Sequence, residues 1–420
     1  MANRPRLSAA GASPPPKYSA MTLSVPVDSL RRTALPVLVA LSAAHFLNDM
    51  IQSLIPAIYP LIKDAYALDF AQIGVITLTF QISASLLQPL IGLFTDRYPM
   101  PYSTIAGMGF TLVGLIGLAH AGSYPLLLLA AAFVGIGSSI FHPEATRMAR
   151  KASGGRHGFA QGLFQVGGQT GGAIGPLLAA FIIVPNGQSS LAWFCAAALL
   201  AMPLLFWTAR HRALAVPVRL AGERREPEVA HRPFREVAFP LAILIVLLCS
   251  KTAYTASFTS FYTFYLIERF GVSVQASQLM LFLFLVSSAA GVLFGGMLGD
   301  RIGRNKIIWF SILGALPFTV ALPYAGLFGT AVLTVLINLI MSSAFAAILV
   351  YAIDLMPHRI GLVGGFFYGL VFGLGGLAAA ALGIFADRYG IDAVYQLCAF
   401  LPAFGLLAFL LPSLRGARVS

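Results

Sequence analysis

Long apolar runs recur along the whole chain, and short polar segments separate them. A run of about 18 or more apolar residues is long enough to cross a bilayer as one helix. The runs predict twelve spans in an all-α membrane protein, near 34–62, 70–94, 102–121, 124–142, 159–184, 190–209, 238–266, 275–298, 306–325, 328–353, 361–386 and 392–412. We expect the fourth to end near Pro143, since proline bends or ends a helix, although the fourth and the tenth could each run further into the following loop.

Composition excludes a soluble globular protein, because 58% of the 420 residues are hydrophobic and only 10% are charged. The formal net charge of +12 would favour nucleic acid in a soluble chain, but 23 of the 27 Lys and Arg residues fall in the tails and in loops on one side. By the positive-inside rule, both termini are predicted to be cytoplasmic. We therefore expect the lipid bilayer as partner, and no nucleic acid.

The chain divides into two halves that repeat. Residues 210–237 are rich in Arg, Glu and Pro and form a predicted cytoplasmic linker between six-helix bundles at 34–209 and 238–412. Gly92, separated by three residues from Asp96-Arg97, matches Gly296, separated by three residues from Asp300-Arg301, 204 positions later. Residues 1–33 and 413–420 are predicted to be cytoplasmic tails, the first of them disordered. Such a repeat is a recurrent transporter architecture, with its site between the halves.

A polar stripe interrupts the first apolar run. His45, Asn48, Asp49 and Gln52 are spaced i, i+3, i+4, i+7, so a helix presents them on one face. A carboxylate at bilayer depth must face a bundle interior or a water-filled cavity. We predict that Asp49, with His45, binds a coupling proton, while Asn48 and Gln52 contact substrate. The alternative is that the amides only hydrogen-bond neighbouring helices.

Further polar groups lie in the fourth and fifth runs. His142 is a candidate substrate ligand and Glu144 a candidate proton carrier, although Glu144 could instead pair with Arg147 or Arg97. Gln165 and Gln169 share a face of the fifth helix, where buried amides need partners, so both are candidate substrate ligands.

The seventh run contains Lys251, followed by aromatic residues that include Tyr254 and Tyr262. An ammonium this deep needs an anionic partner, so Lys251 is the predicted substrate-anion ligand; a permanent salt bridge to Asp49 is the alternative. The two tyrosines are candidate cavity residues. Asp96, Arg97, Asp300 and Arg301 are candidates for a conformational latch at the cytoplasmic helix ends.

No motif for enzymatic chemistry occurs. The sequence lacks GxxxxGK[ST], HExxH and GxSxG, and its three cysteines fall singly in apolar runs. We expect no enzyme activity, no cofactor and no metal.

The loop signature resembles that of the major facilitator superfamily: Gly296-Met-Leu-Gly-Asp300-Arg301, continued by Gly303-Arg304-Asn305-Lys306. The first copy departs from it at Tyr98-Pro99-Met100-Pro101. The resemblance is closest to drug exporters of that family, on His45-Phe-Leu-Asn-Asp49, Phe141-His142-Pro143-Glu144 and Phe164-Gln165-Val-Gly-Gly168.

This resemblance implies the major facilitator fold and alternating access, around a cavity lined chiefly by the first, fourth, seventh and tenth helices. It also implies a monomer in the bacterial inner membrane that uses protons to export small drugs, in particular fosmidomycin-like phosphonates. The alternative is a proton-coupled importer or exchanger of a small anionic metabolite on the same fold, because a fold does not fix direction.

Overall fold

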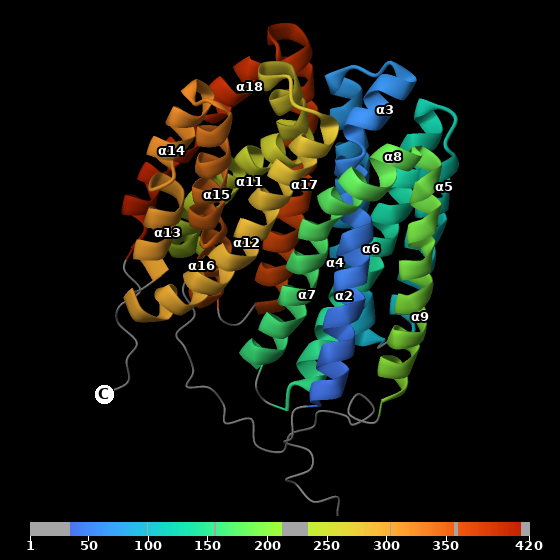
Figure 1. The fold of residues 1–420 in the computed structure, drawn as a ribbon. Helices are drawn as coiled ribbons and strands as arrows, with labels where there is room; N and C mark the ends of the chain where they lie inside the picture. Colours follow the sequence, from blue (N-terminus) through green and yellow to red (C-terminus); the bar gives the residue numbers. More distant parts are fainter. Residues whose placement is uncertain are drawn as a thin grey trace, which may run out of the picture.

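Helices of the first half form one bundle, coloured blue to green in Figure 1. The computed structural model describes residues 34–98, 100–154, 157–211, 234–302, 304–356 and 360–412, and contains no strand among them. The first bundle comprises α2 (Leu35–Ala57), α3 (Tyr59–Tyr66), α4 (Phe70–Arg97), α5 (Ser103–His120), α6 (Tyr124–Ala152), α7 (His157–Leu178), a π-helical turn (Ala179–Ile183), α8 (Val184–Asn186), a 3₁₀ helix (Gln188–Phe194) and α9 (Cys195–Arg210).

The second half forms the other bundle, coloured yellow to red in Figure 1. It comprises α11 (Phe234–Phe270), α12 (Val274–Ile302), α13 (Arg304–Leu313), α14 (Leu316–Ala321), a 3₁₀ turn (Leu322–Tyr324), α15 (Leu327–Ser342), α16 (Ala344–Leu355), α17 (Ile360–Tyr389), α18 (Ile391–Cys398) and a 3₁₀ helix (Leu401–Leu410). Twelve helical stretches of the described residues are long and apolar enough to span a membrane, which confirms the predicted fold class. The predicted tails, and the linker between 212 and 233, lie outside the described residues.

The fourth span continues past Pro143, which is the alternative that the sequence had left open. Helix α6 continues through this proline to Ala152. Proline removes one donor, but Ala145, Met148, Ala149 and Ala152 beyond it are all buried. Their burial at helical spacing stabilises the continued helix more than one missing hydrogen bond destabilises it.

We call the end of the molecule with Ala34 and Pro412 the terminal face, and the opposite end, with Phe70 and Tyr389, the far face. The bundles meet through α4 against α17 and α7 against α12. Hydrogen bonds join them in the far half: Gln278 donates to the carbonyl oxygen of Ala57 at 2.8 Å, and the hydroxyls of Thr77 and Ser260 lie 3.3 Å apart.

Helices α4 and α17 separate towards the terminal face. An ideal Cβ placed on Gly74, near the far face, would lie 2.5 Å from the carbonyl oxygen of Ala379. On Gly376 it would lie 3.1 Å from the Leu78 Cα, and on Gly369, nearest the terminal face, 3.8 Å from the Ser85 carbonyl oxygen. Small residues permit the close approach. The far half of this interface is therefore the tightly closed half.

Candidate functional site

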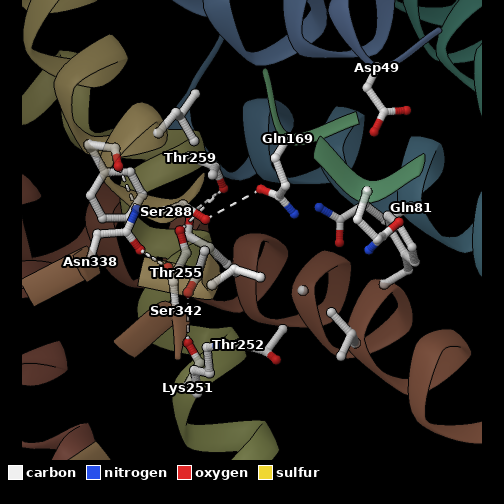
Figure 2. A pocket seen from close by; sticks show the side chains of 18 of the residues that line it. Asp49, Gln81, Gln169, Lys251, Thr252, Thr255, Thr259, Ser288, Asn338 and Ser342 are labelled. Atoms are coloured by element: carbon white, nitrogen blue, oxygen red, sulfur yellow. Dashed lines mark hydrogen bonds between the residues drawn. The ribbon is translucent and has the colours of Figure 1, made fainter. Parts of the chain in front are cut away.

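A cavity of about 390 Å³ lies between the bundles. Residues of α2, α4, α6 and α7 line one wall, and residues of α11, α12, α15 and α17 line the other. The four helices predicted to line it all do so, and four more join them. Its polar lining consists of His45, Asp49, Gln81, His142, Gln165, Gln169, Lys251, Thr252, Thr255, Thr259, Ser288, Asn338 and Ser342 (Figure 2).

Two imidazoles and a carboxylate meet on the first wall, and we call them the His-Asp-His cluster. His45 and Asp49 are one turn apart on α2, and His142 comes from α6. The His45 Nε2 lies 3.1 Å from Asp49 Oδ2, the His142 Nε2 lies 3.4 Å from Asp49 Oδ1, and the two Nε2 atoms are 3.2 Å apart. Asn48 donates to Asp49 Oδ1 at 3.0 Å. His45 is buried, whereas His142 and Asp49 partly face the cavity.

The partners of the two Nδ1 atoms fix the imidazole tautomers. The His45 Nδ1 lies 2.8 Å from the carbonyl oxygen of Phe164, and the His142 Nδ1 lies 3.0 Å from that of Ser138. A carbonyl oxygen only accepts, and the Ser138 hydroxyl, 3.1 Å from His142 Nδ1, donates its own hydrogen to Gln52, so each Nδ1 carries the hydrogen. In neutral imidazoles both Nε2 atoms then bear lone pairs, and they face each other and a carboxylate. The contacts among these three groups contain no donor unless one further proton is bound. One such proton makes the cluster electrically neutral, which suits its burial.

The neighbouring helix α7 holds this cluster in place. The Phe164 ring stacks on the His45 ring with centroids 4.0 Å apart. A Cβ on Gly168 would lie 2.5 Å from His45 Nε2 and 2.7 Å from Asp49 Oδ2, so only glycine leaves room for both side chains. The sequence showed glycine packing on this helix but did not indicate that Gly168 bounds the cluster.

The second wall carries an ammonium and a row of hydroxyls. Lys251 lies on α11 with Thr252, Thr255 and Thr259, which follow it at helical spacing towards the far face. Figure 2 shows Lys251 and Asp49 on opposite sides of the cavity. Asp49 pairs instead with the two histidines, which does not support the alternative of a permanent Lys251–Asp49 salt bridge. Ser288 donates to Gln169 Oε1 at 3.3 Å, so a hydrogen bond crosses between the walls.

Comparison with known proteins shows to which family this architecture belongs. Residues 41–380 match the Major Facilitator Superfamily. The chain belongs to the major facilitator superfamily. It is 54% identical to the "Fosmidomycin resistance protein" of Escherichia coli (strain K12), over 91% of this chain and 94% of that protein. It is 38% identical to the "Uncharacterized MFS-type transporter YfnC" of Bacillus subtilis (strain 168), over 91% and 94%. The protein is therefore a transporter and not an enzyme.

A solved structure supports the fold of this transporter. A bacterial homolog of the human lysosomal transporter Spinster, in an inward-facing and unoccupied conformation, has a TM-score of 0.75. It covers 90% of this chain and 95% of that one, at 17% identity. At this identity the likeness shows the fold alone.

Three predicted substrate ligands of the transporter lie away from this cavity wall. Tyr254 and Tyr262 are buried within the second bundle, where Tyr262 hydrogen-bonds Thr334 at 2.8 Å. They pack around Phe258 because the inward face of α11 there meets neighbouring helices rather than the cavity. Asn48 is fully buried and contacts Asp49, so it supports the cluster from behind. None of these three side chains lines the cavity in this structure, and their contact with substrate stays a prediction.

Gln52 and Glu144 lie in two different surroundings. Gln52 lines a smaller adjoining cavity of about 210 Å³ and accepts from Ser138 at 3.2 Å. Glu144 is buried and forms an ion pair with Arg147 one turn along α6, which is the alternative that its sequence context had left open. Positions 142 and 144, two residues apart, point to different sides of the helix, so Glu144 does not join the cluster.

The predicted latch residues Asp96, Arg97, Asp300 and Arg301 lie at the terminal-face ends of α4 and α12. Their side chains fall outside what the structure describes, so their role stays a prediction.

Proposed function

We propose that this transporter is a proton-coupled exporter of small anionic drugs, in particular fosmidomycin-like phosphonates, in the bacterial inner membrane. The observation that carries the proposal is that the two walls of one cavity present different chemical groups. A cluster that needs a proton lies on the first bundle, and an ammonium with hydroxyl donors lies on the second. The 54% identity to a protein named for fosmidomycin resistance supports the substrate class.

The charge distribution supplies the orientation. Basic residues concentrate in the tails and the loops of the terminal face, so that face is cytoplasmic in this proposal. The tightly packed far half is then the periplasmic half, and the conformation is inward-facing. Rocking of one bundle against the other would expose the same cavity to the periplasm, as in alternating access.

The charges on the two walls bear on whether the proton and the drug move in the same direction or in opposite directions, and a test must distinguish these cases. Without its proton the cluster carries one negative charge, which disfavours an anion in the same cavity; with the proton it is neutral. Coulomb forces alone therefore favour moving proton and anion together. Export in exchange for a proton requires that the drug-bound and proton-bound forms favour opposite-facing states.

Reconstituted protein tests both parts. A fosmidomycin gradient is imposed across proteoliposomes, and the internal pH is followed with a trapped dye. Exchange predicts that protons move against the drug flow, whereas an importer that carries both would move them with it. Asp49→Asn should abolish drug-driven proton movement while drug binding by calorimetry persists. Asp64→Asn, the same change at an exposed position of α3, is the control and should behave as the parent protein. Undiminished proton movement in Asp49→Asn would refute the proton role.

A further inference from the structure

The His-Asp-His cluster also has the geometry of a transition-metal site. In a tetrahedral zinc site with bonds of about 2.0–2.1 Å, neighbouring ligand atoms lie about 3.3 Å apart. The two Nε2 atoms lie 3.2 Å apart, and each faces a different oxygen of Asp49: His45 Nε2 lies 3.1 Å from Oδ2 and His142 Nε2 lies 3.4 Å from Oδ1. One ligand atom from each of the three residues lies within 4.8 Å of the others. The two nitrogens therefore already have the spacing of neighbouring zinc ligands, and the carboxylate that faces both of them can supply the third ligand atom.

The surroundings of the cluster also fit a metal ion. Histidines that bind a metal through Nε2 commonly donate their Nδ1 hydrogen to a backbone carbonyl, as His45 does to Phe164 and His142 does to Ser138. Two imidazoles and one carboxylate suit zinc-class ions better than Mg²⁺ or Ca²⁺. His142 and Asp49 partly face the cavity, which leaves a fourth coordination position on that side.

We propose that His45, Asp49 and His142 bind one divalent transition-metal ion of the zinc class. The sequence did not indicate this site, because His142 is 97 residues from His45 and only the packing of α6 on α2 brings them together. The binding itself does not rest on the proposed function.

Calorimetric titration of ZnCl₂ into the purified, tag-free protein tests the site. We expect one ion per chain, with affinity lowered more than about 10-fold in His142→Asn, since even the loss of an outer-shell partner costs that much. The matched control is His120→Asn, an exposed histidine at the end of α5, which should leave the affinity unchanged. Absence of stoichiometric binding, or equal affinity in His142→Asn, would overturn the site.

A second inference rests on a different part of the molecule, the far-face end of the α4–α17 interface. The carboxylate of Asp387 on α17 accepts the backbone N–H groups of Phe70 and Ala71, each at 2.8 Å. These are the first two residues of α4, whose N–H groups have no partner within their own helix. Asp69 and Gln72 already form a capping box there, so Asp387 adds a second cap from the other bundle.

The sequence around Asp387 repeats the loop signature on the opposite face. Gly383, three residues, Asp387 and Arg388 have the spacing of Gly92 to Arg97 and of Gly296 to Arg301. Gly383 packs directly against the Phe70 carbonyl oxygen, so its missing side chain lets α17 approach the start of α4. Gly383 therefore allows α17 to approach α4 closely, and Asp387 caps the N-terminus of α4.

We infer that Asp387 is a latch that holds the far face closed. Opening that face parts α4 from α17 and removes both hydrogen bonds, so the cap stabilises the closed state alone. Asparagine at this position has one acceptor oxygen instead of two and lacks the charge that favours a helix N-terminus, a loss of about 1 kcal/mol that shifts such an equilibrium about 5-fold.

Spin-label distance measurements test the latch without drug or proton gradient. Labels replace Asp64 on α3 and Tyr324 after α14, both exposed near the far face, in a background whose three native cysteines are alanine. Asp387→Asn should raise the ratio of far-open to far-closed molecules about 5-fold, because the amide nitrogen cannot accept the second helix N–H and the charge is lost. The control Asp392→Asn makes the same change at an exposed carboxylate that pairs with Arg269 inside the second bundle. An unchanged distance distribution in Asp387→Asn, or an equal shift in Asp392→Asn, would rule the latch out.

Discussion

Replacing Gly168 by alanine tests whether the His-Asp-His cluster works only in its observed geometry. The new Cβ would lie 2.5 Å from His45 Nε2, whereas ordinary contacts begin at 3.4 Å, so the ring must move by about 1 Å. The ring is held by its 2.8 Å hydrogen bond to Phe164 and by stacking on the Phe164 ring. A shift of this size breaks that hydrogen bond and leaves a buried N–H without a partner, at a cost of about 1–3 kcal/mol.

We expect drug-driven proton movement in Gly168→Ala to fall between about 10-fold and 100-fold, since a displacement of about 1 Å has effects of this order in preorganised sites. The assay is the internal pH of proteoliposomes under a drug gradient. Gly172→Ala is the matched control, one turn further along α7, where a Cβ meets nothing within 4 Å. Both changes raise helix propensity by about 1 kcal/mol, so propensity does not distinguish them. Equal proton movement in the two variants would refute the reasoning.

Three further outcomes follow from the same structure. Lys251→Ala should weaken drug binding by calorimetry more than about 10-fold and Lys251→Arg less, because arginine keeps the charge; native affinity in the alanine variant would place the anion elsewhere. Glu144→Gln removes the partner of Arg147 inside the protein, so the free energy of unfolding should fall by about 3–5 kcal/mol, measured by denaturation, with drug-driven proton movement per folded molecule retained. If Glu144→Gln kept its normal free energy of unfolding but lost drug-driven proton movement, Glu144 would again be a candidate proton carrier. Gly74→Val should increase labelling of the cavity from the far face and Gly369→Ala should not, as their Cβ positions lie 2.5 and 3.8 Å from α17 and α4 backbone respectively.

The membrane fold was determined by the sequence almost alone. Hydrocarbon provides no hydrogen-bond partners, so each long apolar run must be a helix, and run length alone counts twelve spans. The same constraint made Asp49 and Lys251 detectable as site residues, because a charge at that depth needs a cavity or a partner. Both line the cavity.

Tertiary structure decided which polar groups meet. Spacing within α2 related His45 to Asp49, but only the packing of α6 on α2 brought in His142, and only α7 supplied Phe164 and Gly168. Periodicity gives the face of a helix, not the neighbour of that face, so Tyr254 and Tyr262 looked like cavity residues and are core residues. The Asp387 latch followed the same rule: its motif stands in the sequence, but its target, the start of α4, lies 317 residues away and became visible only when the bundles were placed together.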